Sequence, residues 1–206
     1  MTDWYLYENS ARQEGFQTIC GIDEAGRGPL AGPVFAAAVI LPEHCGIEGI
    51  NDSKKLSPKK REAVFTRITA GAVSYGIGFA TEQEIDEINI LQATFLAMKR
   101  AYDALNVPPD LVMVDGNQKP PLGSVETRTL VKGDALSASI AAASILAKVS
   151  RDRLLLKIDE IYPQYGFAKH KGYGTAYHVE MLKKYGPCPV HRRTFLKKIL
   201  GEQSHE

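Results

Sequence analysis

The sequence has no long hydrophobic run. Its longest uninterrupted apolar stretch extends from Val34 to Leu41, whereas a membrane-spanning helix needs about 18 apolar residues or more. The first residues, Met1 to Tyr5, also lack the basic start and the apolar run of a secretory signal peptide. We therefore expect a cytoplasmic protein with no membrane-embedded part.

Cysteine is scarce and the charge is nearly balanced. The three cysteines form no C-x-x-C pair, which argues against a disulfide framework and a structural zinc site. The formal net charge is only +1, but residues 165–206 hold eight basic and three acidic residues, and a second basic run extends from Lys54 to Arg61. Each patch alone is compatible with a solvated helix face. Two basic patches in a neutral chain imply that acidic residues gather elsewhere, as they do at metal sites.

The hydrophobic pattern predicts a mixed α/β fold. The chain has 206 residues, 44% hydrophobic and 24% charged, which suits one folded core with additions. Three apolar runs with little helix between them predict an antiparallel meander, and two further strands come later. The strands are expected at residues 18–22, 34–41, 73–80, 111–114 and 127–131.

Helical periodicity appears in two long segments and in the tail. Apolar residues spaced by three and four predict helices over 82–105 and 137–161, and the second begins with small residues that would let it press against a sheet. Shorter helices are expected at 175–184 and 194–200. We therefore expect a mixed-sheet core over residues 1–162, followed by a basic helical C-terminal extension over 163–206.

The most unusual segment is the glycine-rich stretch from Gly21 to Pro33. Its spacing is not G-x-G-x-x-G, and it leads into a strand, whereas a dinucleotide-binding turn must open a helix. A tight loop without β-carbons at Gly26 and Gly28 can instead bring backbone N–H groups and Arg27 up to a ligand. Loops of this kind suit a phosphate or a sugar hydroxyl.

Four acidic residues lie at the ends of predicted elements: Asp23, Glu24, Asp115 and Asp134. Neighbours on a regular strand face opposite sides, so Asp23 and Glu24 serve one site only if the chain bends there. Taken singly, the residues also suit a solvated strand end, an Asp-Gly turn at Asp115 and a helix N-cap at Asp134. Taken together, they would repel one another unless a hard cation such as Mg²⁺ or Mn²⁺ neutralised them. Two such ions form a clamp for displacement at phosphorus, which predicts a phosphodiester substrate.

The chain resembles bacterial ribonuclease HII, the type 2 ribonuclease H. The resemblance covers nearly the whole chain, and the departures are small, such as Thr194 where serine is expected and Cys188 at a variable position. The matching blocks are G-I-D-E-A-G-R-G-P-L-A-G-P from Gly21, N-D-S-K-K-L from Asn51, V-D-G-N from Val114, K-G-D-A from Lys132, S-I-A-A-A-S-I-L-A-K-V from Ser139, R-D-R from Arg151, H-K-G-Y-G-T from His170 and G-P-x-P-x-H-R from Gly186.

The resemblance implies a ribonuclease H-like mixed five-stranded sheet flanked by helices, which forms a catalytic core over residues 1–162. The same resemblance implies that the C-terminal helical extension over 163–206 packs on this core and contributes to substrate binding. It also implies an endoribonuclease whose catalytic and metal-binding residues are Asp23, Glu24, Asp115 and Asp134, with two divalent ions, Mg²⁺ or Mn²⁺, in the reacting complex. Such an enzyme cleaves on the 5′ side of ribonucleotides embedded in duplex DNA, and it degrades the RNA of RNA–DNA hybrids. The products carry 3′-hydroxyl and 5′-phosphate ends.

The resemblance further assigns substrate contacts. Gly26, Arg27 and Gly28 would contact the 2′-hydroxyl, which distinguishes a ribonucleotide from its DNA neighbours. Tyr173 would stack on the sugar of the following deoxynucleotide, although a tyrosine packed on the core remains an alternative. We expect His191 to serve packing or phosphate contact, since no second His or Cys lies at ligand spacing. The candidates for backbone phosphates are Lys54, Lys55, Lys171, Arg192 and Arg193.

Two other functions remain open at this point. A junction resolvase on the same fold would need the acidic cluster but not the Gly-Arg-Gly turn or Tyr173. A non-catalytic nucleic-acid-binding module would need only the basic patches, and it would bind equally well with a chelator present. The expected partner is an RNA–DNA hybrid or a DNA duplex containing ribonucleotides, and we expect a monomer.

Overall fold

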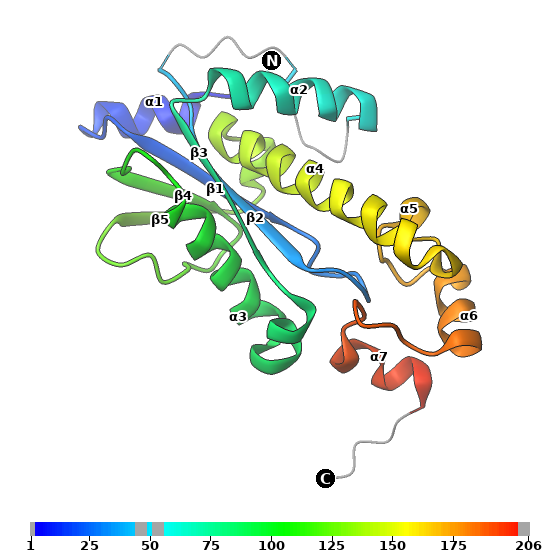
Figure 1. The fold of residues 1–206 in the computed structure, drawn as a ribbon. Helices are drawn as coiled ribbons and strands as arrows, with labels where there is room; N and C mark the ends of the chain where they lie inside the picture. Colours follow the sequence, from blue (N-terminus) through cyan, green and yellow to red (C-terminus); the bar gives the residue numbers. More distant parts are fainter. Residues whose placement is uncertain (1–2, 44–48, 51–55, 202–206) are drawn as a thin grey trace.

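The computed structural model describes residues 3–43, 49–50 and 56–201. A five-stranded sheet in the order β3-β2-β1-β4-β5 separates two helical layers, with α3 on one face and α2 and α4 on the other (Figure 1). The strands are β1 Ile19–Ala25, β2 Val34–Ile40, β3 Ser74–Ala80, β4 Leu111–Asp115 and β5 Glu126–Leu130. The helices are α1 Leu6–Gln13, α2 Pro58–Gly71, α3 Glu82–Asp103, α4 Ala138–Ile161, α5 Phe167–His170, α6 Ala176–Tyr185 and α7 Arg193–Leu200, with 3₁₀ turns η1 Gly133–Ala135 and η2 Pro163–Tyr165.

The sheet is mixed, as the sequence predicts. β1, β2 and β3 form an antiparallel meander, whereas β4 pairs parallel with both β1 and β5. Because β1 and β4 run in the same direction, their C-terminal ends meet at one edge of the sheet. Ile22 pairs with Val114, so the next residues, Asp23 and Asp115, are neighbours on adjacent strands. This register positions the acidic site.

α4 packs unusually close to the sheet. Its first turns are rich in buried alanine, and β1 presents Gly21 beneath them. A β-carbon on Gly21 would lie 2.2 Å from the backbone carbonyl carbon of Ser139, so only glycine permits this approach. The small-residue run therefore has the predicted role. Within the described ranges neither α4 nor any other helix has the length and apolarity needed to cross a membrane.

The C-terminal extension packs on the far end of α4 (Figure 1). Phe167 and Leu196 from the extension share a hydrophobic cluster with Leu155 of α4 and with Leu30 and Ala31 of the loop after β1. The extension therefore contributes to a core that also includes residues from the N-terminal third of the chain. A boundary at residue 162 remains a prediction.

Three helices were not predicted, and one long helix is interrupted. α1, α2 and the short α5 have no counterpart among the expected elements. α2 lies between β2 and β3, so the prediction of little helix there is wrong. α2 buries only Val64 and Ile68, which explains its weak hydrophobic period. α3 is kinked at Asn89, whose φ of 66° breaks the helix. The Asn89 side chain accepts hydrogen bonds from the N–H groups of Leu91 and Gln92 and so begins a new helical segment.

Candidate active site

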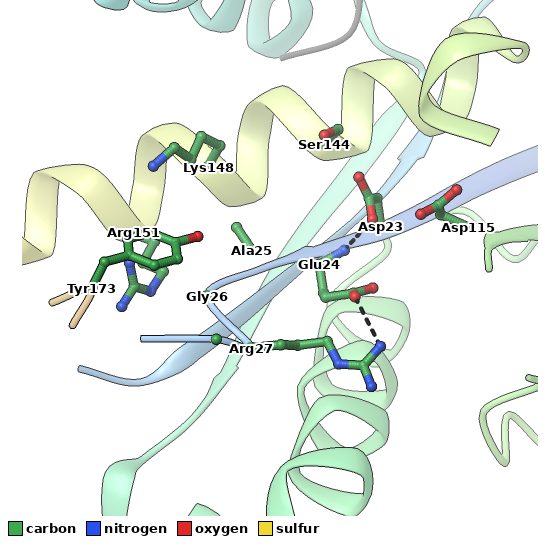
Figure 2. A pocket seen from close by; sticks show the side chains of 11 residues that line it. Asp23, Glu24, Ala25, Gly26, Arg27, Asp115, Ser144, Lys148, Arg151 and Tyr173 are labelled. Atoms are coloured by element: carbon green, nitrogen blue, oxygen red, sulfur yellow. Dashed lines mark hydrogen bonds and ion pairs between the residues drawn. The ribbon is translucent and has the colours of Figure 1, made fainter. Parts of the chain in front are cut away.

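Asp23, Glu24 and Asp115 line one pocket of about 240 Å³ at the edge where β1 and β4 end. β1 continues as a regular strand through Ala25, so the predicted bend between Asp23 and Glu24 is absent. Asp23 points toward α4, on the same side as Asp115, whereas Glu24 points toward Arg27 (Figure 2). The two carboxylates nevertheless share the pocket because it opens at the rim of the sheet, where both faces are accessible.

The electrostatics of Asp23 are those of a carboxyl group crowded by like charges. Burial raises the pKa of Asp23 well above its ordinary value, and the charges of Glu24 and Asp115 raise it further. Hydrogen bonds from Ser144 and from the Glu24 N–H, the latter 2.7 Å long, act in the opposite direction. A cation placed beside Asp23 would relieve the repulsion.

Glu24 has a similar environment with one compensating cation. Burial raises the pKa of Glu24, the Arg27 guanidinium lowers it, and the charge of Asp115 raises it. Arg27 Nη1 lies 3.4 Å from Glu24 Oε1, and its side chain is 49% exposed. Because a pair this exposed is held weakly, Arg27 can turn to a ligand at little cost.

Asp134 lies in the 3₁₀ turn η1 and is buried. The N-cap of α4 is Ser137, whose side chain accepts from the Ile140 N–H, so the alternative reading of Asp134 as that cap is wrong. The turn adjoins β4, because the Gly133 N–H donates to Asp115 Oδ1 over 2.7 Å. Asp134 does not line the pocket that holds the other three acidic residues. Its role as a metal ligand remains a prediction.

The carboxylates fit a hard divalent cation. Within the described parts of the chain, no three His, Cys, Asp or Glu side chains lie close enough together to enclose one ion. Mg²⁺ is commonly held by one or two carboxylates, with water and substrate phosphates completing its coordination. Neighbouring carboxylates that repel each other, as the buried Asp23 and the half-buried Asp115 do, suit this shared kind of binding.

The glycine turn and Tyr173 lie at the other end of the same pocket. Gly26, Arg27, Gly28 and Tyr173 all contribute to its wall. Gly26 has a φ of +98°, in the region that favours glycine. A β-carbon on Gly28 would lie 3.7 Å from Tyr173 Cε1, and Tyr173 is 48% exposed. The alternative of a tyrosine packed on the core is therefore wrong.

α4 adds three residues to the pocket that the sequence analysis did not single out: Ser144, Lys148 and Arg151. They follow one another at spacings of four and three, so they lie on one face of the helix (Figure 2). Lys148 Nζ lies 2.7 Å from Asp152 Oδ1, and burial lowers the pKa of Lys148. The helical spacing of these polar residues within an alanine-rich helix was the signal that could have found them.

The predicted phosphate contacts have different outcomes. Arg192 is fully buried, and its guanidinium donates to the backbone oxygens of Gly26, Arg27 and Gly32, so the prediction of a phosphate contact there is wrong. Lys171 is half-buried, and its ammonium donates to the Ala168 carbonyl. Arg193 is exposed. Lys54 and Lys55 lie outside the described residues.

A buried histidine pair supports the turn that carries Tyr173. His178 Nδ1 lies 2.9 Å from the Tyr173 carbonyl oxygen, and His178 Nε2 lies 3.0 Å from His191 Nε2. His178 Nδ1 donates to that carbonyl, and His191 Nδ1 accepts from the Cys188 N–H, so His191 Nε2 donates to His178 Nε2 and each neutral ring uses one donor and one acceptor nitrogen. Burial, together with the neighbouring His178, lowers the pKa of His191 to about 4. This arrangement confirms the packing role expected for His191.

Acidification is expected to destabilise the extension through these histidines. The unfolded state takes up a proton near the ordinary histidine pKa of about 6.5, but native His191 does so only at about pH 4. The stability is therefore fully present above pH 6.5 and is lost as the pH falls toward 4. Between about pH 7.5 and pH 5, the thermal midpoint should fall more in the wild type than in His191→Gln. Equal falls would contradict this prediction.

Neighbouring carboxylates at the ends of two parallel strands, beside a glycine turn and cationic side chains, suit hydrolysis of a phosphodiester rather than acyl transfer or redox chemistry. The fold and this site together define a nuclease of the ribonuclease H-like class. A family model described as Ribonuclease HII matches residues 20–198. The chain belongs to the ribonuclease HII family, and it is an endoribonuclease that acts on the RNA of RNA–DNA hybrids with divalent metal ions.

Relatives and solved structures agree with this assignment. A ribonuclease HII of Caldicellulosiruptor saccharolyticus is 54% identical over 198 residues, which cover 96% of each chain. The crystal structure of ribonuclease H2 from Pyrococcus horikoshii superimposes with a TM-score of 0.74 at 30% identity, covering 90% of this chain and 98% of that one. A structure of Bst-RNase HIII in complex with Mn²⁺ shares the fold, with a TM-score of 0.64 at 17% identity, covering 86% of this chain and 65% of that one.

Proposed function

We propose that this endoribonuclease incises DNA duplexes on the 5′ side of an embedded ribonucleotide, in addition to cutting the RNA of hybrids, and that it leaves 3′-hydroxyl and 5′-phosphate ends. One observation carries the proposal: three of the four acidic residues, the Gly26–Gly28 turn and Tyr173 line a single pocket. A resolvase would need the carboxylates alone, and a binding module would need neither the carboxylates nor the turn.

The two ends of the pocket suit the recognition of a junction between a ribonucleotide and the deoxyribonucleotide that follows it. The turn offers backbone groups and the Arg27 guanidinium at close range, which suits hydrogen bonding to a 2′-hydroxyl. The Tyr173 ring lies where a β-carbon added to Gly28 would touch it, so the ring stands beside the turn and would meet the sugar of the next nucleotide. An added 2′-hydroxyl on that sugar would disfavour the stacking contact. A ribonucleotide followed by a deoxyribonucleotide would satisfy both contacts.

Asp23, Glu24, Asp115 and Asp134 would hold two divalent ions, Mg²⁺ or Mn²⁺. When bound, the ions supply an activated water and stabilise the departing 3′-oxygen. The residues of the chain orient this chemistry, because the parallel register of β1 and β4 holds Asp23 beside Asp115. Ser144 bonds to Asp23, which fixes the direction of that carboxylate.

Exposed basic residues would hold the duplex by its phosphates. Arg193 and the half-buried Lys171 lie in the extension, and Lys54 and Lys55 remain candidates from the sequence. Contacts of this kind position a duplex without reading its sequence. They also make binding weaken as the salt concentration rises.

The direct test is incision of a labelled DNA duplex that contains one ribonucleotide. We expect cleavage 5′ of the ribonucleotide with Mg²⁺ or Mn²⁺ and none with a chelator. A matched all-DNA duplex should remain intact, and a four-way DNA junction tests the resolvase alternative. Cleavage of the hybrid but not of the single-ribonucleotide duplex would refute the junction specificity, whereas resolution of the four-way junction would favour the other class.

The role of Asp134 needs its own variant, because Asp134 does not line the pocket. We expect Asp134→Asn to bind the duplex normally but to lose most of its turnover, since the change removes one negative oxygen and preserves shape. The measurement is kcat with Mg²⁺ at saturating duplex, together with duplex affinity in chelator. A near-normal kcat would remove Asp134 from the mechanism.

A further inference from the structure

Two buried arginines join the core to the C-terminal extension beneath the substrate-recognition residues. Arg151 lies on α4 and is 1% exposed, and Arg192 directly precedes α7 and is fully buried. Neither guanidinium forms an ion pair with a carboxylate in the described part of the chain. Because isolated buried cations are costly, their N–H groups must be satisfied by other acceptors.

Arg151 donates both to the loop after β1 and to the segment that precedes Tyr173. Its Nη2 and Nε donate to the carbonyls of Ala31 and Pro33, each over 3.0 Å, on the loop after β1. Its Nη1 donates over 2.9 Å to the carbonyl of Lys171, two residues before Tyr173. A single planar side chain thus fixes the backbone that leads to Tyr173 against the loop that contains the glycine turn.

Arg192 holds the glycine turn from the opposite direction. Its Nη2 and Nη1 donate to the carbonyls of Gly26 and Arg27 over 2.6 and 2.9 Å, and its Nε donates to that of Gly32 over 2.9 Å. The Arg192 N–H also donates to the Leu30 carbonyl over 2.9 Å. The extension therefore determines where the turn lies.

Direct contacts join the same two segments. The Leu30 N–H donates over 2.8 Å to the carbonyl of Gly172, the residue before Tyr173. Burial lowers the pKa of Arg192 to about 9 and that of Arg151 to about 10, so both remain charged near pH 7. Their hydrogen bonds are therefore of the stronger, charge-assisted kind.

We propose that Arg151 and Arg192 are positioning residues that set the spacing between the Gly26–Gly28 turn and Tyr173, and that they thereby determine the preference for a single ribonucleotide in DNA over a continuous hybrid. The inference rests on the proposed function, because it assigns the 2′-hydroxyl to the turn and the following deoxyribose to Tyr173. The rigid fork of arginine is essential, since lysine donates from a single flexible point.

The two substrates depend on this spacing to different degrees. A single ribonucleotide in DNA requires the turn and Tyr173 to engage adjacent sugars at the same time. A hybrid presents a 2′-hydroxyl on the following sugar as well, so it gains little from Tyr173 and tolerates a displaced turn. Misplacement by about 1 Å can cost about 100-fold in rate, and this cost should fall mainly on the single-ribonucleotide substrate.

The test compares Arg151→Lys and Arg192→Lys with the wild type on both substrates, with Mg²⁺ present. The readout is the ratio of kcat/KM on the single-ribonucleotide duplex to kcat/KM on the hybrid. We expect this ratio to fall about 10-fold or more in each variant. The matched control is Arg153→Lys, an exposed arginine two positions along α4 that pairs with Glu62, and its ratio should equal that of the wild type.

Hydrogen exchange gives a readout that is independent of activity. In a folded variant we expect faster exchange in residues 26–32 and 171–174 together, with β1 and α4 unchanged. If Arg192→Lys does not fold, Arg151→Lys carries the same test. A folded variant with a wild-type ratio, or an equal loss on both substrates, would overturn the inference. Failure of the wild type to incise the single-ribonucleotide duplex would instead refute the proposed function, and the inference would fall with it.

Discussion

Asp23→Asn should reduce kcat by about 1,000-fold or more and leave duplex binding nearly unchanged. The substitution preserves the shape of the side chain but removes its negative charge. Asp23 lies beside Asp115 where β1 and β4 end. Divalent ions would lose one of their anionic ligands, whereas the basic surfaces that bind phosphates would be untouched. The loss should therefore appear in kcat with Mg²⁺ and not in duplex affinity measured in chelator.

The same variant should be more stable than the wild type when metal is removed. Burial and the charges of Glu24 and Asp115 raise the pKa of Asp23, so its native state holds a proton more tightly than its unfolded state does. Stability is therefore lost as the pH rises through the raised pKa. Asn carries no charge, so we expect a higher thermal midpoint for Asp23→Asn at pH 7 with chelator, and a smaller shift when Mg²⁺ is added.

Asp103→Asn is the matched control, because Asp103 is exposed and pairs with Lys99 one helical turn away. It should leave kcat, duplex affinity and the response to Mg²⁺ unchanged. Near-normal turnover by Asp23→Asn would exclude Asp23 from the mechanism. A lower thermal midpoint than that of the wild type in chelator would contradict the electrostatic argument.

Gly26→Ala should destabilise the fold by about 2–4 kcal/mol and reduce activity by about 100-fold. The φ of +98° at Gly26 is strained for any other residue. A β-carbon there would also lie 2.0 Å from Nε of the buried Arg151. The chain would have to displace either the glycine turn or the guanidinium that holds the loop after β1, and each displacement changes the pocket.

Gly28→Ala is the matched comparison within the same turn. Gly28 does not have a positive φ, and its β-carbon would meet only the Tyr173 ring, at an ordinary contact distance of 3.7 Å. We expect a much smaller loss of stability and a smaller loss of activity than for Gly26→Ala. Unfolding midpoints in urea and kcat/KM on the single-ribonucleotide duplex measure the two effects. Similar losses in both variants would show that the contact with Arg151 is not what requires glycine.

Sequence patterns predicted the elements that carry strong periods. The strands at 18–22, 34–41 and 111–114 are short apolar runs bounded by turn residues, and each is a strand in the structure. α2 was not predicted because it is largely solvent-exposed and its first turn contains the basic residues Lys59, Lys60 and Arg61. A helix that buries few side chains leaves a weak pattern in its sequence. The kink in α3 was not predicted because the apolar residues keep their helical spacing on both sides of Asn89.

The candidate site was predictable in its acidic residues and its glycine turn with Arg27, but not in the cations that α4 supplies. Asp23, Glu24 and Asp115 stand at the ends of apolar strands, and the ends of parallel strands meet. Lys148 and Arg151 lie on α4, and they reach the pocket only because of the way in which α4 packs across β1. That packing depends on the fit of Gly21 beneath the helix, which no local pattern shows.

The sequence by itself determined the strands, the residue types at their ends and the presence of a glycine turn, because period, turn chemistry and charge are local properties. Only the tertiary structure decided which basic residues face outward. Arg192 and Arg193 are adjacent, yet one is buried and the other is exposed. Arg192 is internal because three carbonyls from a loop some 160 residues earlier in the chain match its planar fork, and contacts between such distant segments exist only after folding.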